Sequence, residues 1–199
     1  MSVTPFDSAL YRDLMGDAEL SRLFADSADI RAMLIVWGAL ARAQGAHGLI
    51  PETAAAFLHR ATLELQIDPA GLSGATGANG VCVPGLVAAT RKALEAPEHA
   101  AFLHWGATSQ DVIDTGLALR LRQALTLIAA RLETALGALA RLAEAHAETP
   151  MAARTYGQIA TPTSFGAVVA SWGEGLLAAR ETLPRIRDRV EIVTLDGTT

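Results

Sequence analysis

The chain has 199 residues, of which 51% are hydrophobic and 5% are aromatic, and its formal net charge is −5. A mean hydropathy of +0.28 with so small a charge excludes a disordered chain, because disorder needs low hydrophobicity and high net charge. Ala occurs 40 times, and Ala and Leu head the ranking of helix propensity. The composition argues against an all-β or doubly wound α/β fold and predicts a helical protein.

Few features point to a cellular compartment. The single cysteine, Cys82, excludes a disulfide framework and a cysteine-based zinc cluster, and it fits a reducing compartment. No basic stretch followed by an apolar one opens the chain, and the most apolar run, residues 32–41, is about half the length of a membrane helix. A pI near 5.5 without a basic cluster argues against a nucleic-acid partner. We expect a soluble, cytoplasmic protein that binds neither membranes nor nucleic acids.

The N-terminal part of the chain predicts several helices. Residues 1–28 hold short apolar pieces between polar breaks, which predict short helices. Asp29 can cap a helix over about residues 30–46. Pro51, a residue favoured in the first turn, then opens a helix that runs to about residue 64.

Two loops are predicted next. Residues 68–80 are rich in Gly and small polar residues, and loops of that length are more often functional than not. A helix over about residues 84–94 follows. Pro97 breaks it, and a second loop is expected to reach about residue 114.

The segment from residue 115 to 147 predicts one long helix. It has no Pro, and its leucines and one isoleucine recur at steps of three and four, which forms an apolar seam. At 1.5 Å per residue this helix is about 50 Å long, more than the diameter of about 42 Å expected for a compact chain of this size. The helix therefore needs partner helices from missing residues, other subunits or both.

The pattern breaks over residues 148–162 and resumes as a second long helix, capped by Thr163 or Ser164 and reaching about residue 187. One long hairpin without further helices makes an incomplete bundle. We expect an all-α fold. Residues 1–110 would form an N-terminal helical domain, and residues 111–199 the first long helices of a central helical bundle.

A dense polar cluster precedes the first long helix. His104 is followed by Thr108, Ser109 and Gln110, which offer two hydroxyls, an amide and backbone N–H groups at a helix N-terminus. Such donors suit a carboxylate. These residues alone leave two interpretations open, a ligand site and a helix cap.

A second cluster lies between the two long helices. Arg154 offers a rigid fork for a carboxylate, and Tyr156 and Gln158 can donate hydrogen bonds beside Thr155. The alternative is an ordinary connecting loop with a surface Arg. A third, weaker candidate is the Gly-rich segment around Asn79. The five histidines are scattered, so no metal site is expected.

Together these clusters resemble the fumarase/aspartase superfamily. Residues 104–111 match its H-x-G-x-T-S-x-D motif, and residues 154–166 match R-T-H-x-Q-x-A-x-P-x-T-x-G with Tyr156 in place of His. The segment around Asn79 also lacks the His of adenylosuccinate lyases. The wording of both motifs looks most like the 3-carboxy-cis,cis-muconate cycloisomerase branch, which replaces the lyase His by an aromatic residue.

This resemblance implies a lactone-forming enzyme of protocatechuate breakdown by the β-ketoadipate route, with a small polycarboxylate substrate and neither metal nor organic cofactor. His104, Ser109 and Tyr156 would be catalytic. Asn79, Thr108, Ser109, Gln110, Arg154, Thr155 and Gln158 would bind the substrate. Donors placed in advance would stabilise an enolate-like intermediate.

The resemblance also implies that the chain is the front part of a longer subunit. The superfamily's third motif, a mobile loop with the Ser that moves the proton, has no match in residues 167–199. Its active sites combine regions from three subunits of a homotetramer joined through the long helices. We expect the 199-residue chain alone to be inactive. Two alternatives stay open, which are a lyase like adenylosuccinate or argininosuccinate lyase and a non-catalytic helical oligomerisation module.

Overall fold

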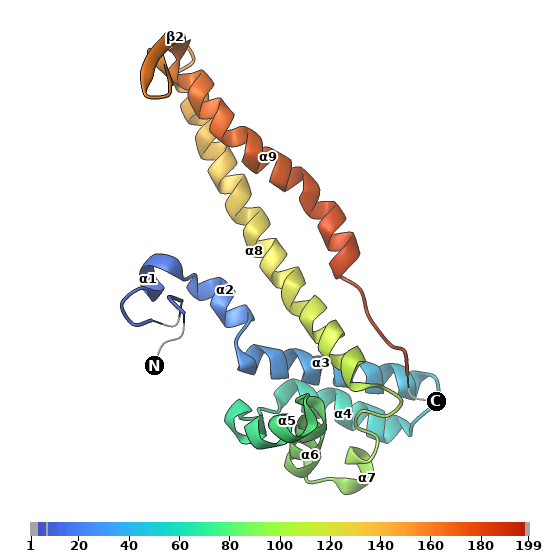
Figure 1. Cartoon of the computed structure of the whole chain (residues 1–199). Helices are drawn as coiled ribbons and strands as arrows, with labels where there is room; N and C mark the ends of the chain where they lie inside the picture. Colours follow the sequence, from blue (N-terminus) through green and yellow to red (C-terminus); the bar gives the residue numbers. More distant parts are fainter. Residues whose placement is uncertain (1–3, 7, 198–199) are drawn as a thin grey trace. The chain divides into compact units, whose positions relative to one another are not determined.

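The fold is described from a computed structural model, which covers residues 4–6 and 8–197. Helices dominate it, and the only sheet among the described residues is a two-stranded hairpin, so the all-α prediction is confirmed. Two compact units share the chain (Figure 1). One unit holds the residues up to Gln123 together with those from Glu191, and the other is Ala124–Val190.

The core of the first unit lies between α3 (Asp26–Ala46) and α4 (Glu52–Glu64). Gly38 and Gly45 allow the two helices to approach closely because they have no Cβ. A Cβ on Gly38 would overlap the side chain of Thr62, and one on Gly45 would overlap Ala55. The most deeply buried large side chains of this core belong to Trp37, Met33, Leu34, Leu58, Leu86 and Leu103. Both helices match their predicted ranges, although α3 begins four residues earlier than predicted.

The prediction of a loop over residues 68–80 is wrong. A 3-10 turn, η1 (Pro69–Leu72), and a short helix, α5 (Ser73–Asn79), occupy it. Asp68 starts the turn by accepting the N–H of Ala70 at 3.1 Å, and the buried Leu72 attaches the segment to the core. Gly80, at φ 74°, ends α5 in the left-handed conformation. Local caps and one apolar anchor therefore outweigh the low helix propensity of Gly.

The remaining short helices are close to their predicted places. α6 (Val83–Leu94) follows the prediction, whereas α7 (Pro97–Ala100) adds one helical turn to the segment predicted as a second loop. At the N-terminal end α1 (Arg12–Met15) and α2 (Ala18–Leu23) are the short helices expected there. The part of that prediction that falls on residues 1–3 and 7 lies outside the described residues.

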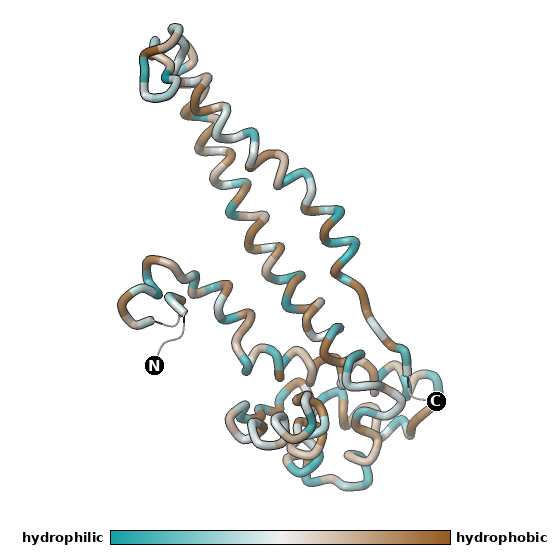
Figure 2. Tube along the Cα trace, in the orientation of Figure 1, coloured by the Kyte–Doolittle hydropathy of each residue, from teal (hydrophilic) through white to brown (hydrophobic). Residues whose placement is uncertain are grey.

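The long helices are α8 (Ser109–Ala145) and α9 (Phe165–Val190). α8 begins six residues before its predicted start, and Figure 1 shows α9 running back beside it from the hairpin. Figure 2 shows apolar residues separated by polar ones along both helices. This is the pattern expected when apolar residues repeat every three or four positions. In the second unit Gly166 lets the start of α9 lie against the end of α8, because an added Cβ would overlap the backbone carbonyl of Ala143.

The connection between the long helices is a β-hairpin, which the sequence did not predict. Strand β1 (Pro150–Thr155) pairs antiparallel with β2 (Gln158–Ser164), and a bulge falls between Ala152 and Arg154. Tyr156 and Gly157 form the turn with φ angles of 46° and 75°. Two consecutive positive φ angles are the mark of the type I′ turn that two-residue hairpins favour.

The residues after α9 return to the first unit. Thr194 and the hydroxyl of Thr115 on α8 exchange two hydrogen bonds, of 3.1 and 3.3 Å. Compactness therefore places the start of α8 and the segment from Glu191 together, and the predicted domains 1–110 and 111–199 stay a prediction. In the part of the chain that is described, we find no helix with the length and apolarity needed to cross a membrane.

Candidate functional site

The first predicted cluster forms the N-terminus of α8. The backbone N–H of Thr108 donates to Asp111 Oδ2 at 2.7 Å, and the N–H of Asp111 donates back to Thr108 Oγ1 at 3.3 Å. This reciprocal pair is a capping box, so the cap interpretation holds for Thr108 and Asp111. The next two amides, of Ser109 and Gln110, have no acceptor within the helix. The N-terminus therefore keeps donors for an anion.

Asp111 is buried, with 2% of its surface exposed. Burial alone would raise the pKa of its carboxyl, but hydrogen bonds from Asp196, Thr108 and Gly197 outweigh that effect and lower the pKa. The N–H of Asp196 donates to Asp111 Oδ1 at 2.9 Å. One ionised carboxylate thus caps α8 and anchors the segment that follows α9.

His104 lies just before this cap with a positive φ of 64°. The indole Nε1–H of Trp37 on α3 donates to His104 Nδ1 at 3.0 Å, and the two rings meet edge-on at 5.6 Å between centroids. Burial, followed by the charge of Arg91, lowers the pKa of His104, and Asp111 opposes both effects. The imidazole is therefore held mainly neutral.

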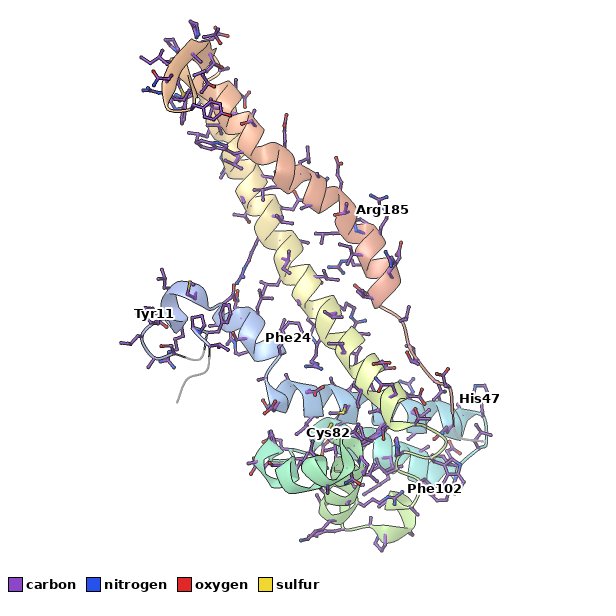
Figure 3. The ribbon with its side chains drawn as sticks, in the orientation of Figure 1. Tyr11, Phe24, His47, Cys82, Phe102 and Arg185 are labelled. Carbon is purple, nitrogen blue, oxygen red and sulfur yellow. The ribbon has the colours of Figure 1, made fainter. Side chains whose placement is uncertain are left out.

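Two further side chains fix the same connection between α7 and α8. Gln44 donates through Nε2 to the carbonyl of Trp105 at 2.7 Å, and Arg91 on α6 donates to the carbonyl of Leu103 at 3.1 Å. Phe102, labelled in Figure 3, packs beside Trp105 at 5.8 Å between ring centroids. Trp37, Gln44 and Arg91 were not among the site residues predicted from the sequence. Trp37 and Gln44 are seven residues apart, so the sequence places them on one face of α3, but it does not show what that face contacts.

The second predicted cluster lies on the β-hairpin. Arg154 and Thr155 end β1, Tyr156 is the first turn residue, and Gln158 begins β2. All four are exposed, and Tyr156 is fully so. Thr155 and Gln158 face each other across the turn in the strand register. The hairpin therefore presents a guanidinium, a phenol and an amide to the solvent.

The two clusters belong to different compact units. His104, Thr108, Ser109 and Gln110 lie together in the first unit, with Ser109 only partly exposed. The Gln110 side chain donates to Asp114 Oδ1 at 2.6 Å, which engages one of its two amide hydrogens. Its remaining hydrogen and its carbonyl oxygen can still contact a ligand.

Asn79 is exposed at the end of α5, where its Nδ2 donates to the carbonyl of Ala75 at 2.8 Å. Near it, burial and the charge of Asp29 raise the pKa of the Cys82 thiol, which leaves this cysteine a poor nucleophile. A cavity of about 620 Å³ beside Arg31 and Leu34 contains none of the predicted site residues. Among the described residues, no cluster of three His, Cys, Asp or Glu side chains could hold a metal ion.

Comparison with known proteins identifies the family. Residues 27–199 match the family model described as lyase. The chain belongs to this family, within the fumarase/aspartase superfamily. A 3-carboxy-cis,cis-muconate cycloisomerase of Pseudomonas aeruginosa is 36% identical over 182 residues, which cover 90% of this chain and 40% of that protein.

A relative and a solved structure with different names also match the chain. A nitrosuccinate lyase of Streptomyces davaonensis is 38% identical over 168 residues, or 83% of this chain and 35% of that protein. The crystal structure of a 3-carboxy-cis,cis-muconate lactonizing enzyme from Pseudomonas putida matches with a TM-score of 0.91 and 34% identity, over 96% of this chain and 44% of that one. The chain thus spans about two fifths of the length of the relatives it matches.

Proposed function

We propose that this chain is the N-terminal portion of a 3-carboxy-cis,cis-muconate cycloisomerase. Membership of the lyase family supports an enzyme, and the relatives named as cycloisomerases support this branch. The same level of identity joins the chain to a nitrosuccinate lyase, so the relatives' names alone do not select the reaction. A feature of the chain itself must separate the two.

The observation that carries the proposal is Tyr156 at the tip of the hairpin. The lyases of the superfamily have a His at this position, and a His can exchange a proton near neutral pH. A phenol at neutral pH is a hydrogen-bond donor instead. With Arg154 on the same hairpin, Tyr156 would orient a carboxylate without taking the proton. Lactone closure by a substrate carboxylate needs such a donor more than it needs a base.

The N-terminus of α8 would bind another carboxylate of the substrate. The free amides of Ser109 and Gln110 and the positive end of the helix dipole favour an anion there. Thr108 is the cap that fixes this helix start, because its side chain hydrogen-bonds both the backbone N–H and the carboxylate of Asp111. Negative charge that develops beside a carboxyl group in the transition state would meet donors already in place.

We propose that the rest of the site comes from elsewhere in a homotetramer. The proton-transferring Ser implied by the family resemblance would lie beyond residue 199, and no metal or organic cofactor is proposed. The protein would act in the cytoplasm on a small tricarboxylate in protocatechuate breakdown. Asn79, Thr155 and Gln158 are proposed substrate contacts. The lyase and the oligomerisation module remain the alternatives.

The test is a spectrophotometric assay of the full-length gene product with 3-carboxymuconate, argininosuccinate, adenylosuccinate and nitrosuccinate. Turnover of the first substrate alone is expected. Turnover of one of the others without 3-carboxymuconate would replace the proposal by the lyase. The absence of any turnover, with intact folding, would favour the module. The 199-residue chain is expected to turn over none of them.

A variant tests the role of the phenol in the full-length enzyme. Tyr156→Phe should lower kcat/KM by about tenfold to a hundredfold, the effect of one hydrogen bond to a charged group. Tyr11→Phe is the matched control, because Tyr11 lies outside both predicted clusters, just before α1, and is also exposed. Equal activity of both variants would remove Tyr156 from the site.

A further inference from the structure

The hydrogen bond between Trp37 and His104 has only one possible direction. An indole nitrogen always donates, so His104 Nδ1 must accept and cannot carry a proton. A neutral imidazole has one N–H, which must then be on Nε2. Within residues 4–6 and 8–197, Nε2 has no hydrogen-bond partner. The ring therefore presents one N–H donor whose tautomer the protein determines.

The surroundings of this pair are rigid. Trp37 has 1% of its surface exposed within the core of the first unit. The backbone next to His104 is held at the carbonyls of Leu103 and Trp105 by Arg91 and Gln44. His104 itself adopts a left-handed backbone conformation, which costs a non-Gly residue about 1–2 kcal/mol. A strained residue with its ring and both neighbours fixed is typical of a functional position.

We propose that Trp37 is a positioning residue, which holds His104 as the Nε2–H tautomer so that His104 donates a hydrogen bond to the substrate and carries no proton in the reaction. The tautomer stands on geometry alone, whereas the substrate contact rests on the function proposed above. A neutral donor with a fixed direction can bind a carboxylate or an enolate oxygen at any pH above its own titration. It cannot act as a base, because its only lone pair accepts the indole N–H.

The charged groups around His104 agree with this role. Arg91 on α6 disfavours a second positive charge on the imidazole, and Asp111 on α8 favours it. Burial has the largest effect and also favours the neutral ring. The side chain on α3 that faces the imidazole is Trp37, which carries no charge and offers a donor only.

The first test reads the tautomer directly by NMR of the chain labelled with 15N-histidine. At pH 8 we expect His104 to show a protonated Nε2 and an unprotonated Nδ1, and to titrate below the ordinary pKa of about 6.5. A protonated Nδ1 would overturn the proposal. This measurement needs no variant and no substrate, so its outcome is independent of the cycloisomerase assay.

A variant isolates the indole. Trp37→Phe keeps an aromatic ring in the core and removes the donor, so the His104 tautomers should mix and the pKa should rise. Trp172→Phe is the matched control, since Trp172 lies on α9 and contacts Phe165 rather than His104. An unchanged tautomer and pKa in folded Trp37→Phe would also overturn the proposal.

The second test separates a donor from a proton carrier in the full-length enzyme. Gln can place an N–H near the position of Nε2 but cannot titrate. His104→Gln should retain kcat/KM within about tenfold of the wild type, whereas His104→Ala should lose about a hundredfold. Equal losses in the two variants would show that a donor alone does not suffice and would contradict this role of His104.

Discussion

Asp111 is the residue on which the start of α8 depends. It accepts hydrogen bonds from the N–H groups of Thr108 and Asp196. Because Asp111 is buried, the loss of either bond should lower the stability of the fold substantially. Replacement by Ala leaves the two donors without acceptors, so Asp111→Ala should lower the free energy of unfolding by about 2–4 kcal/mol. Urea denaturation measures the change. Asp114→Ala, one turn further on and less buried, should cost less than about 1 kcal/mol.

The same residue predicts how stability depends on pH. The folded pKa of Asp111 lies below its unfolded value, so the unfolded state binds more protons between the two. Its contribution is complete above about pH 4 and is lost as the pH falls through the folded pKa. Asp111→Ala should therefore show a smaller loss of stability on acidification than the wild type. An equal loss would mean that folding does not lower the pKa of the Asp111 carboxyl.

Several residues of this site could be predicted, and others could not. The motif residues Thr108, Ser109 and Gln110 were found because they are adjacent in the chain and precede a long apolar seam. Trp37 and Gln44 were missed because they contact the site from a helix more than 60 residues away. Nothing local distinguishes a Trp that packs from one that also donates a hydrogen bond.

At the level of the elements, the periodic helices were predictable and the short ones were not. α8 and α9 carry their own signal, since their apolar residues repeat every three or four positions. The hairpin was missed because Tyr-Gly is a poorer marker of a type I′ turn than Asn-Gly. α5 was missed because its helix depends on a neighbouring cap and on Leu72 in the core, which propensity does not record.

The turn of the hairpin is open to a matched glycine experiment. Gly157 has a φ of 75° and open space around it, so Gly157→Ala adds backbone strain of about 1 kcal/mol without a clash. Gly175→Ala in α9 also meets open space but adopts no positive φ, and there Ala should stabilise the helix. Amide hydrogen exchange of β1 and β2 should accelerate several-fold in Gly157→Ala only. Equal rates in both variants would contradict the type I′ turn.

At the level of the whole molecule, the apolar core is distributed unevenly between the two units. Among the described residues, the buried apolar side chains of the second unit are Ala124, Val169 and Leu183, whereas the first unit holds the continuous core around α3 and α4. Trp172, Leu177 and Ile186 of α9 are exposed. Local stability follows buried apolar contacts, so the two units should not open together.

We therefore expect native-state hydrogen exchange of the 199-residue chain to show two levels of protection. At low micromolar concentration the amides of α9 and of α8 beyond Gln123 should exchange at least tenfold faster than those of α3 and α4. The reason is that opening the second unit breaks fewer buried apolar contacts than opening the first. A concentration series is the control. If copies of the chain pack along the apolar seams, protection of α9 should rise with concentration while that of α3 stays constant. Equal protection of α3 and α9 at the lowest concentration would mean that the second unit is stable by itself, and the seams would then need no partner.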